Sequence, residues 1–471
     1  MSQIVDIRPR SGASVADRAE AGRAARERVP LEAHGDWKPA PGRRSPVDVL
    51  ETQAAARLPD LVPVRYGRML LSPLSFYRGA ALVMANDLAP SPSSGFTVQA
   101  CGDAHLSNFG IFGTPERDLA FDVNDFDETL PGPWEWDVKR LAASLAIAGR
   151  YDGFDRATRR AIVTACARSY RTAMERFASM KFMDVWYTRV DSAVMQQWSS
   201  QVTKKQRKKV QKTAAKALAK DSTRALSKLT TSEGGELRFV SQPPLLVPMS
   251  ELMTGGERTE AVEWLRGLLD QYATSLRPEL RHLLANYRMV DMARKVVGVG
   301  SVGTRAFVIA MQGRDQADAL VLQAKEATAS VLEEFVGASA FAHHGQRVVV
   351  GQRSMQAASD ILLGWVRSPG VDGIERDFYV RQLWDWKGSM DVEGALPSGL
   401  GVYGELCAWT LARAHARTGD AVAISAYLGE GDRFDRAISR FAEVYADQNE
   451  ADHQALAQAV QDGRVQALTG L

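Results

Sequence analysis

Hydrophobic residues recur along most of this chain at steps of three and four positions, the spacing that gathers them on one face of an α-helix. The spacing predicts mainly helical structure from residue 136 to residue 287, and helices again beyond residue 383. It is clearest in the stretches Val47–Leu61, Ser75–Leu88, Leu141–Ala148, Ala157–Met180, Lys204–Leu229, Ala261–Tyr287, Gly404–Arg417 and Phe434–Ala446. We therefore expect a large helical region.

Strand patterns occupy fewer residues. Phe96–Ala100 and Leu119–Val123 are short β-prone runs that border two loops rich in acids. After Asp291 the pattern changes, and residues 294–313 and 318–327 predict three successive strands. The run QRVVVGQRSM, residues 346–355, predicts a fourth strand. A small antiparallel sheet should therefore follow the helical region, which makes the expected fold class α+β.

The chain is expected to divide into four parts. Residues 1–45 are rich in Arg, Ala, Gly and Pro without a sustained period, which predicts a loosely ordered leader. Residues 46–290 form a helical lobe that carries the acid-rich loops, and residues 291–370 form a small β-rich lobe. Residues 371–471 supply a hinge and the helices that complete the large lobe.

Composition excludes some classes of partner. Lys+Arg 58 against Asp+Glu 56 leaves a formal charge of +2, so no global field draws the protein to nucleic acid or a membrane. The basic stretch from Lys204 to Lys220 favours a solvated helix face over a nucleic-acid contact. The apolar runs are far shorter than the roughly 20 residues of a membrane span. We expect neither a membrane partner nor a nucleic-acid partner.

The cysteines indicate the compartment. Cys101, Cys166 and Cys407 are odd in number and far apart, which disfavours a disulfide framework and is typical of a reducing environment. The first residues mix acids and arginines without an apolar core, so they do not predict a secretory signal. A cytoplasmic protein is expected.

The two acid-rich loops carry the strongest chemical signal. Asp103 and Asn108 follow the first strand run in the pattern D-x-x-x-x-N, and Asp125-Phe126-Asp127 follows the second in the place of a metal-binding D-F-G. Asp103 is expected to orient an acceptor hydroxyl and take its proton. Asn108 and Asp125 would bind Mg²⁺, with Asp127 as a further metal ligand. The alternative is that these residues only cap turns between short strands.

A glycine motif lies almost 200 residues downstream. Gly298, Gly300 and Gly303 form G-x-G-x-x-G between strand-like runs, with Ser301 inside the motif. Glycine lets the backbone approach phosphate oxygens closely, and the strand–turn–strand context favours a lid over ATP phosphates rather than a dinucleotide fold.

A lysine follows on the next predicted strand. Lys325, in LVLQAKEA, resembles the V-A-I-K lysine of kinases, which implies contact with the α- and β-phosphates of ATP and pairing with Glu333 or Glu334. The alternative for Lys325 is a strand-edge lysine that faces solvent.

These motifs resemble the protein-kinase-like superfamily, closest in style to aminoglycoside and choline phosphotransferases, whose catalytic loop reads H-G-D-x-x-x-x-N. Cys101 stands where the leading histidine would be. The resemblance implies a two-lobed fold, with ATP and Mg²⁺ bound between the lobes. Because the catalytic loop precedes the glycine-rich lobe here, it also implies a circular permutation. Leu411–Ala416 is similar to the end of the helix that normally leads into the catalytic loop.

A second resemblance covers more of the chain. Residues 23–463 resemble a bacterial family known as a domain of unknown function, with matching text in SPLSFYRGAA, CGDAHLSNFG, NDFDETLPGPWEWDVKRLAAS, YVRQLWDWKGS and LARAHARTGD. Three further site candidates lie in this text. His105 stands where small-molecule kinases often carry a histidine, Arg78 would bind phosphate or brace an acid, and Asp137 would brace the catalytic loop from a helix start.

The expected function is an ATP- and Mg²⁺-dependent phosphotransferase that acts on a small-molecule or protein hydroxyl. Two alternatives stay open at this point. One is a nucleotide-binding pseudokinase that regulates a partner, and the other is a nucleotidyltransferase that modifies protein. The joint presence of Asp103, Asn108, Asp125 and Lys325 favours catalysis, because a binding module does not need the base.

Overall fold

Helices and antiparallel sheets both contribute to the fold, which is mixed α+β as predicted. The computed structural model describes residues 12–199, 229–233, 236–252, 267–296, 298–369, 373–383, 388 and 392–470. The predicted helix Lys204–Leu229 and its basic run thus lie almost wholly outside the described residues. In the part that is described, no helix has the length and apolar character needed to cross a membrane.

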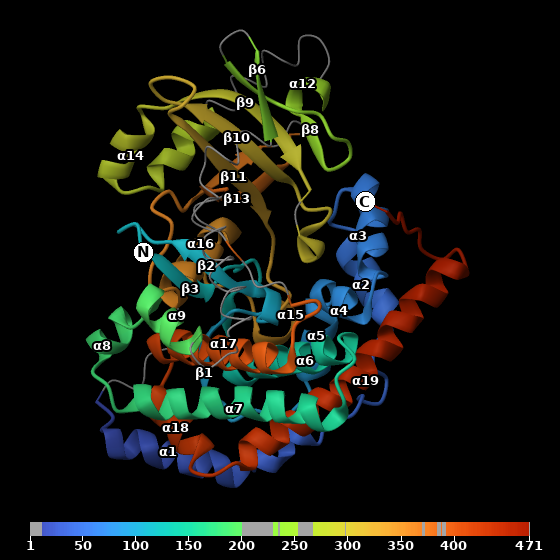
Figure 1. The fold of residues 1–471 in the computed structure, drawn as a ribbon, viewed down its shortest axis with the longest axis vertical. Coiled ribbons are helices and arrows are strands. Elements are labelled where there is room, and N and C mark those ends of the chain that lie inside the picture. Colours follow the sequence, from blue (N-terminus) through green and yellow to red (C-terminus); the bar gives the residue numbers. More distant parts are fainter. Residues whose placement is uncertain are drawn as a thin grey trace.

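The helices lie mainly at one end of the molecule and the largest sheet at the other (Figure 1). The described α-helices are α1 (Val15–Arg28), α2 (Pro46–Ala54), α3 (Val62–Met69), α4 (Pro73–Gly79), α5 (Ala81–Leu88), α6 (Trp134–Tyr151), α7 (Arg156–Ala178), α8 (Phe182–Tyr187), α9 (Ser192–Ser199), α12 (Met249–Leu252), α14 (Pro278–Leu284), α15 (Glu333–Val336), α16 (His344–Met355), α17 (Pro397–Thr418), α18 (Ala421–Leu428) and α19 (Arg433–Gln461). Short 3₁₀ turns include η1 (Leu31–Gly35), η2 (Pro59–Leu61), η3 (Leu106–Asn108) and η4 (Val299–Ser301).

Six antiparallel strands form the largest sheet, in the order β12-β13-β11-β10-β9-β8. Smaller sheets pair β1 with β4, β2 with β3 and β5, and β6 with β7. The strands are β1 (Thr97–Ala100), β2 (Phe109–Gly113), β3 (Leu119–Val123), β4 (Leu130–Pro133), β5 (Val190–Asp191), β6 (Thr230–Glu233), β7 (Glu236–Phe239), β8 (Leu246–Pro248), β9 (Arg288–Lys295), β10 (Ala306–Gln312), β11 (Ala319–Ala327), β12 (Gly364–Pro369) and β13 (Glu375–Gln382). Three successive strands, β9, β10 and β11, correspond to those predicted after Asp291, but β9 begins at Arg288, before the predicted run that starts at residue 294.

Both faces of the six-stranded sheet are covered. Val308 and Ala310 of β10 join a core with β7, whereas Ile309 between them joins a second core with α14. Alternate residues of a strand point to opposite faces, so a run of apolar residues is the expected sequence for a strand buried on both sides. A third and larger core joins α6, α7, α17 and α19, with Trp134 stacked on Tyr170 at 5.5 Å between ring centroids.

The fourth predicted strand, residues 346–355, is wrong, because this segment lies in helix α16. Its consecutive valines favour a strand locally, but Val348 and Val349 are buried in the large core that also contains residues of α6 and α17. Gly351 allows a close approach, since a Cβ there would lie 2.4 Å from the Thr129 side chain. Packing against the loop that carries Thr129 thus overrides local propensity.

The segment expected to be a loose leader also needs correction, because the described residues 12–45 contain an ordered helix. Ser14 and Asp17 form a capping box at the start of α1. Arg18 donates to both carboxylate oxygens of Asp420 at 2.9 Å through Nε. Gly22 packs so tightly on α18 that a Cβ would lie 2.3 Å from the carbonyl oxygen of Ala423. Contacts with the far end of the chain therefore order this segment, which local sequence could not reveal.

A buried ion pair joins β3 to α17, two elements almost 300 residues apart. Arg413 Nη2 donates to Asp122 Oδ1 at 2.6 Å and to Oδ2 at 2.7 Å, and both side chains are almost fully buried. Burial raises the pKa of Asp122, and the Arg413 guanidinium opposes this effect. The pair fixes the strand that leads into the second acid-rich loop.

We predict that R413M lowers the free energy of unfolding by about 3–5 kcal/mol, because it leaves the Asp122 carboxylate buried without its counter-charge. Urea denaturation measures the loss. The matched control is R436Q, which breaks the exposed pair with Asp432 and should change stability by less than about 1 kcal/mol. Adding D122N to R413M should recover part of the loss. Equal effects of R413M and R436Q would contradict the importance of this pair.

Candidate active site

A cavity of about 290 Å³ lies between the loops that follow β1 and β3 on one side and β11, β13 and the turn Gly298–Gly303 on the other. This turn is called the glycine turn below. Ten of the residues singled out from the sequence line it, and they come from segments far apart in the chain. The described lining residues are Gln53, Arg78, Gly79, Ala81, Asp103, His105, Asn108, Asp125, Asp127, Glu128, Lys295, Gly298, Val299, Gly300, Ser301, Gln323, Lys325, Arg381 and Leu383.

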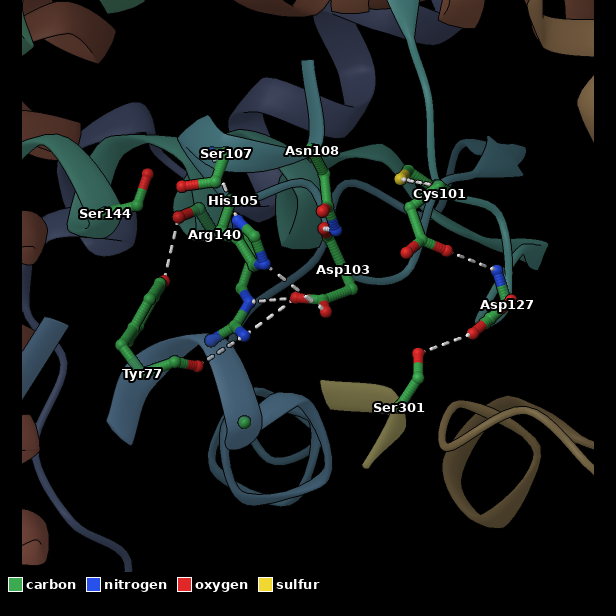
Figure 2. Close-up of polar contacts among 12 residues, drawn as sticks. Tyr77, Cys101, Asp103, His105, Ser107, Asn108, Asp127, Arg140, Ser144 and Ser301 are labelled. Atoms are coloured by element: carbon green, nitrogen blue, oxygen red, sulfur yellow. Dashed lines mark hydrogen bonds and ion pairs between the residues drawn. The ribbon is translucent and has the colours of Figure 1, made fainter. Parts of the chain in front are cut away.

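Asp103 is held by a buried arginine. Arg140, on α6, donates to Asp103 Oδ1 at 2.8 Å through Nε, and its Nη2 lies 2.7 Å from the same oxygen. The guanidinium packs over the Tyr77 ring at 3.9 Å and donates to the Tyr77 carbonyl at 2.7 Å. Figure 2 shows Asp103 between Arg140 on one side and Asp127 with Ser301 on the other. Among the described residues no group donates a hydrogen bond to Oδ2 of Asp103, so this oxygen can accept one from a ligand.

The backbone that carries Asp103 is braced from α6. The Asp137 carboxylate accepts from the N–H of Cys101 at 2.6 Å and from that of Gly102 at 2.9 Å. His415 on α17 contacts the same carboxylate through Nε2 at 3.1 Å. Gly102 has φ +80°, and a Cβ there would lie 2.4 Å from the Glu128 carbonyl oxygen. Asp137 therefore has the bracing contacts that the sequence predicted, and it does not line the cavity.

Asn108 and His105 complete this loop. Asn108 Nδ2 donates to the Asp103 carbonyl at 2.8 Å, which leaves its side-chain oxygen for a ligand. His105 Nδ1 accepts from the Ser107 N–H at 3.2 Å, and its Nε2 lies 3.8 Å from Asp103 Oδ2. Burial lowers the pKa of His105 to about 3, so the ring is neutral at physiological pH. His105 shapes the loop and carries no charge.

The Asp127 side chain links the loop that follows β3 to the glycine turn, β11 and β13. Its carboxylate accepts from Ser301 Oγ at 3.2 Å and from the Tyr379 hydroxyl at 2.8 Å, and it forms an ion pair with Lys325. Its backbone N–H donates to Asp125 Oδ1 at 3.3 Å. The glycine turn, β11 and β13 are thus tied to the loop that follows β3.

Lys325 lies buried on β11 and faces the acids, not solvent. Burial lowers the pKa of Lys325, but the Asp125 and Asp127 carboxylates raise it by more than burial lowers it. The pKa therefore lies above its ordinary value, and the ammonium stays charged.

The predicted pairing of Lys325 with Glu333 or Glu334 does not form. Glu333 accepts from the N–H of Ser330 at 3.0 Å, and Glu334 pairs with Arg44 at 2.9 Å. Both glutamates lie on the single turn of α15, and neither lines the cavity.

The glycine turn is built as a 3₁₀ turn between β9 and β10, so the predicted strand–turn–strand context is confirmed. Gly298 and Gly300 line the cavity, and a Cβ at Gly298 would meet nothing within 4 Å, which leaves the backbone open to a ligand. Gly303 has φ +91°, faces Arg57 and does not line the cavity. Its role is to turn the chain, because this φ favours glycine.

Five charged or amide residues that line the cavity were missed by sequence reasoning: Gln53, Glu128, Lys295, Gln323 and Arg381. Gln323 and Arg381 are cross-strand partners of β11 and β13, and Arg381 Nε donates to Gln323 Oε1 at 3.3 Å. Only strand register brings them together. Glu128 directly follows Asp127, so this third neighbouring acid was a signal that could have been used.

The donor chemistry of the cavity fits Mg²⁺. No group of three or more His, Cys, Asp or Glu side chains that could hold a metal alone exists within the described ranges. Magnesium in phosphoryl-transfer sites usually takes one or two carboxylates and completes its shell with phosphate oxygens and water. Asp125, Asp127 and Asn108 offer such hard oxygen donors at the cavity wall.

A model of the family described as "Uncharacterized protein conserved in bacteria (DUF2252)" matches residues 57–459. The chain belongs to the DUF2252 family. The matched DUF2252 span contains every described cavity residue except Gln53, and the family description names no reaction. Neither a curated protein nor a solved structure matches the chain.

The Glu128 carboxyl should make the free energy of unfolding depend on pH. Its Oε2 accepts from the Val331 N–H at 2.8 Å, and burial raises the pKa of Glu128 from 4.5 to about 7. Between these two values the folded protein binds a proton that the unfolded chain releases, so the free energy of unfolding falls as pH rises from 4.5 to 7. Glutamine cannot ionise, so E128Q should lack this fall.

We expect E128Q to gain about 2–3 kcal/mol relative to the unsubstituted protein between pH 5 and pH 8, measured by urea denaturation across this range. The control is E20Q, at an exposed position of α1, whose pH profile should run parallel to that of the unsubstituted protein. A constant difference between E128Q and the unsubstituted protein would show that Glu128 does not carry this dependence.

Proposed function

We propose that this protein is an ATP- and Mg²⁺-dependent phosphotransferase that acts on a hydroxyl group. The observation that carries the proposal is the contact of Asp127 with Ser301 and Lys325, residues 174 and 198 positions away. A glycine turn, a buried lysine and a pair of acids lining one cavity are the parts that position a triphosphate in kinases. Their convergence in one cavity supports ATP as the ligand.

The order of elements supports a circularly permuted, two-lobed kinase-like fold. In kinases the glycine-rich loop joins the first two strands, the lysine lies on the third strand, and a helix follows. Here β9 and β10 flank the glycine turn, Lys325 lies on β11, and α16 follows and packs on β11 and β13.

The last part of the chain completes the other lobe in this reading. Tyr403 on α17 donates from its hydroxyl to the Leu106 carbonyl at 2.8 Å. Arg413 and His415 on the same helix contact Asp122 and Asp137. A helix late in the chain therefore supports both acid-rich loops, as the permutation requires.

The chain's own residues account for the reaction as follows. Lys325, with the N–H groups of the glycine turn, binds and orients the phosphates, and Asn108, Asp125 and Asp127 would hold Mg²⁺. When bound, the metal neutralises phosphate charge. Asp103 accepts the proton of the acceptor hydroxyl through Oδ2, while Arg140 fixes its other oxygen. The acceptor oxygen forms a bond to the γ-phosphorus, the bond from that phosphorus to the bridging oxygen breaks, and ADP leaves with the electron pair.

The direct test uses two labels. The protein is incubated with Mg²⁺, a cell metabolite extract and either γ-labelled or α-labelled ATP. Label transferred from the γ position alone supports the proposal. Label transferred from the α position indicates a nucleotidyltransferase, and binding of ATP without any transfer indicates a pseudokinase.

We predict that D103N lowers the rate of transfer at least about 100-fold while ATP affinity changes little, because it removes the proton acceptor and keeps an oxygen for Arg140. Steady-state kinetics and isothermal titration with ATP measure the two effects. D184N, at an exposed position of α8, is the control and should match the unsubstituted protein. Equal turnover of D103N and D184N would remove Asp103 from the chemistry.

We predict that D125N weakens ATP binding about 10-fold or more when Mg²⁺ is present and far less when it is chelated, because the lost charge faces the metal. Titration of ATP in both conditions measures this difference. If the two conditions give the same loss, Asp125 does not act through a metal.

A further inference from the structure

Two cations of the cavity have no ion-pair partner among the residues that the structure describes. Arg78 on α4 and Lys295 at the end of β9 line the cavity, yet neither forms an ion pair or side-chain hydrogen bond with any residue in the described ranges. Lys325, by contrast, pairs with Asp127, and Arg381 donates to Gln323. Partly buried cations without partners are rare in folded proteins, because desolvation of a charge is costly unless an opposite charge compensates it.

The wall behind Arg78 is also cationic. Arg65 is fully buried and donates to Gln53 Oε1 at 2.6 Å and to the Gly79 carbonyl at 2.8 Å, but its Nε and Nη1 have no partner in the described part of the chain. Arg57 donates to the Val302 carbonyl at 2.5 Å, and its Nε likewise meets no hydrogen-bond partner in the described segments. Neither arginine forms an ion pair with a described carboxylate. Three arginines on or near α4 thus lie on one side of the cavity without an ion pair to any described carboxylate.

This side is where the acceptor would bind. Burial lowers the pKa of Arg78, and the carboxylates of Asp103 and Glu393 oppose this effect, which places Arg78 in the field of the proposed base. Lys325 and Ser301 instead contact Asp127, in the part of the cavity assigned to the phosphates of ATP. Arg78 and Lys325 therefore face different carboxylates, and Arg78 is available for a second anion.

The same side is walled by helices. The Leu58 N–H donates to the Gly303 carbonyl at 2.8 Å, and a small core of Leu61, Val64, Val296 and Val302 joins the glycine turn to the helical region. A Cβ at Gly300 would lie 3.3 Å from the Arg78 carbonyl oxygen, so α4 packs directly against the turn. This packing of α4 against the turn limits the room beside Arg78 and favours a small acceptor over a loop of another protein.

We propose that the acceptor is a small hydroxyl compound that carries an anionic group, a phosphate or a carboxylate, and that Arg78 binds this group beside Asp103. The identification of this ligand as the acceptor substrate rests on the proposed function, but anion binding at Arg78 can be tested without turnover. A guanidinium suits both anions, since its N–H groups form paired hydrogen bonds to phosphate and carboxylate oxygens.

The test is calorimetric titration of the intact protein with inorganic phosphate and, separately, with glycerate. Each titration is made with the free protein and with protein saturated by Mg²⁺ and a non-hydrolysable ATP analogue. We expect saturable binding of at least one anion in the presence of the analogue, weakened at least about 10-fold in R78Q and less in R78K. The two titrants distinguish a phosphate-bearing acceptor from a carboxylate-bearing one.

R44Q, which removes an exposed arginine paired with Glu334, is the matched control and should bind as the unsubstituted protein does. Circular dichroism and thermal unfolding establish that R78Q is folded, and R78K supplies a second variant should it not be. Binding that is absent in the unsubstituted protein, or equal in R78Q and R44Q, overturns the inference. Failure of the ATP analogue to bind overturns the proposed function instead, and the free-protein titrations still decide the anion site.

Discussion

The Asp127 carboxylate is the interaction on which the candidate site depends. It receives Ser301 from the glycine turn, Lys325 from β11 and Tyr379 from β13, and its own loop is continuous with Asp125. A buried ammonium requires a counter-charge close by, so the sheet can bury Lys325 only while the loop after β3 stays against it. Folding and the assembly of the cavity are therefore one process.

Charge balance explains the rest of the cavity wall. Among the acids that line the cavity, Asp103 forms an ion pair with Arg140 and Asp127 forms one with Lys325. Arg78 on α4 and Lys295 at the end of β9 form no ion pair within the described ranges. The lack of an ion pair at these two cations supports the proposal that a ligand supplies their counter-charge. The electrostatic pattern thus separates the proposed ATP side of the cavity from the proposed acceptor side.

Helix α17 shows how a late segment supports chemistry encoded early. Through Tyr403, Arg413 and His415 it contacts η3, β3 and Asp137, which together position both acid-rich loops. Because what matters for the site is where groups converge, the order of these segments along the chain is free to change. The contacts from α17 therefore position both acid-rich loops within residues 101–128, although α17 follows them in the sequence.

The sequence by itself determined the local signals: the acids at fixed spacing after short strands, the glycine turn between β9 and β10, and Lys325 on the strand that follows. These follow from residue type and nearest neighbours, because turns, strand alternation and glycine conformations are local properties. Tertiary structure alone decided that Lys325 meets Asp127 and not Glu333 or Glu334, that residues 346–355 form a helix, and that Arg78, Lys295 and Arg381 share one cavity. These outcomes depend on strand register and on packing between segments far apart in the chain, and neither is written in any short stretch of residues.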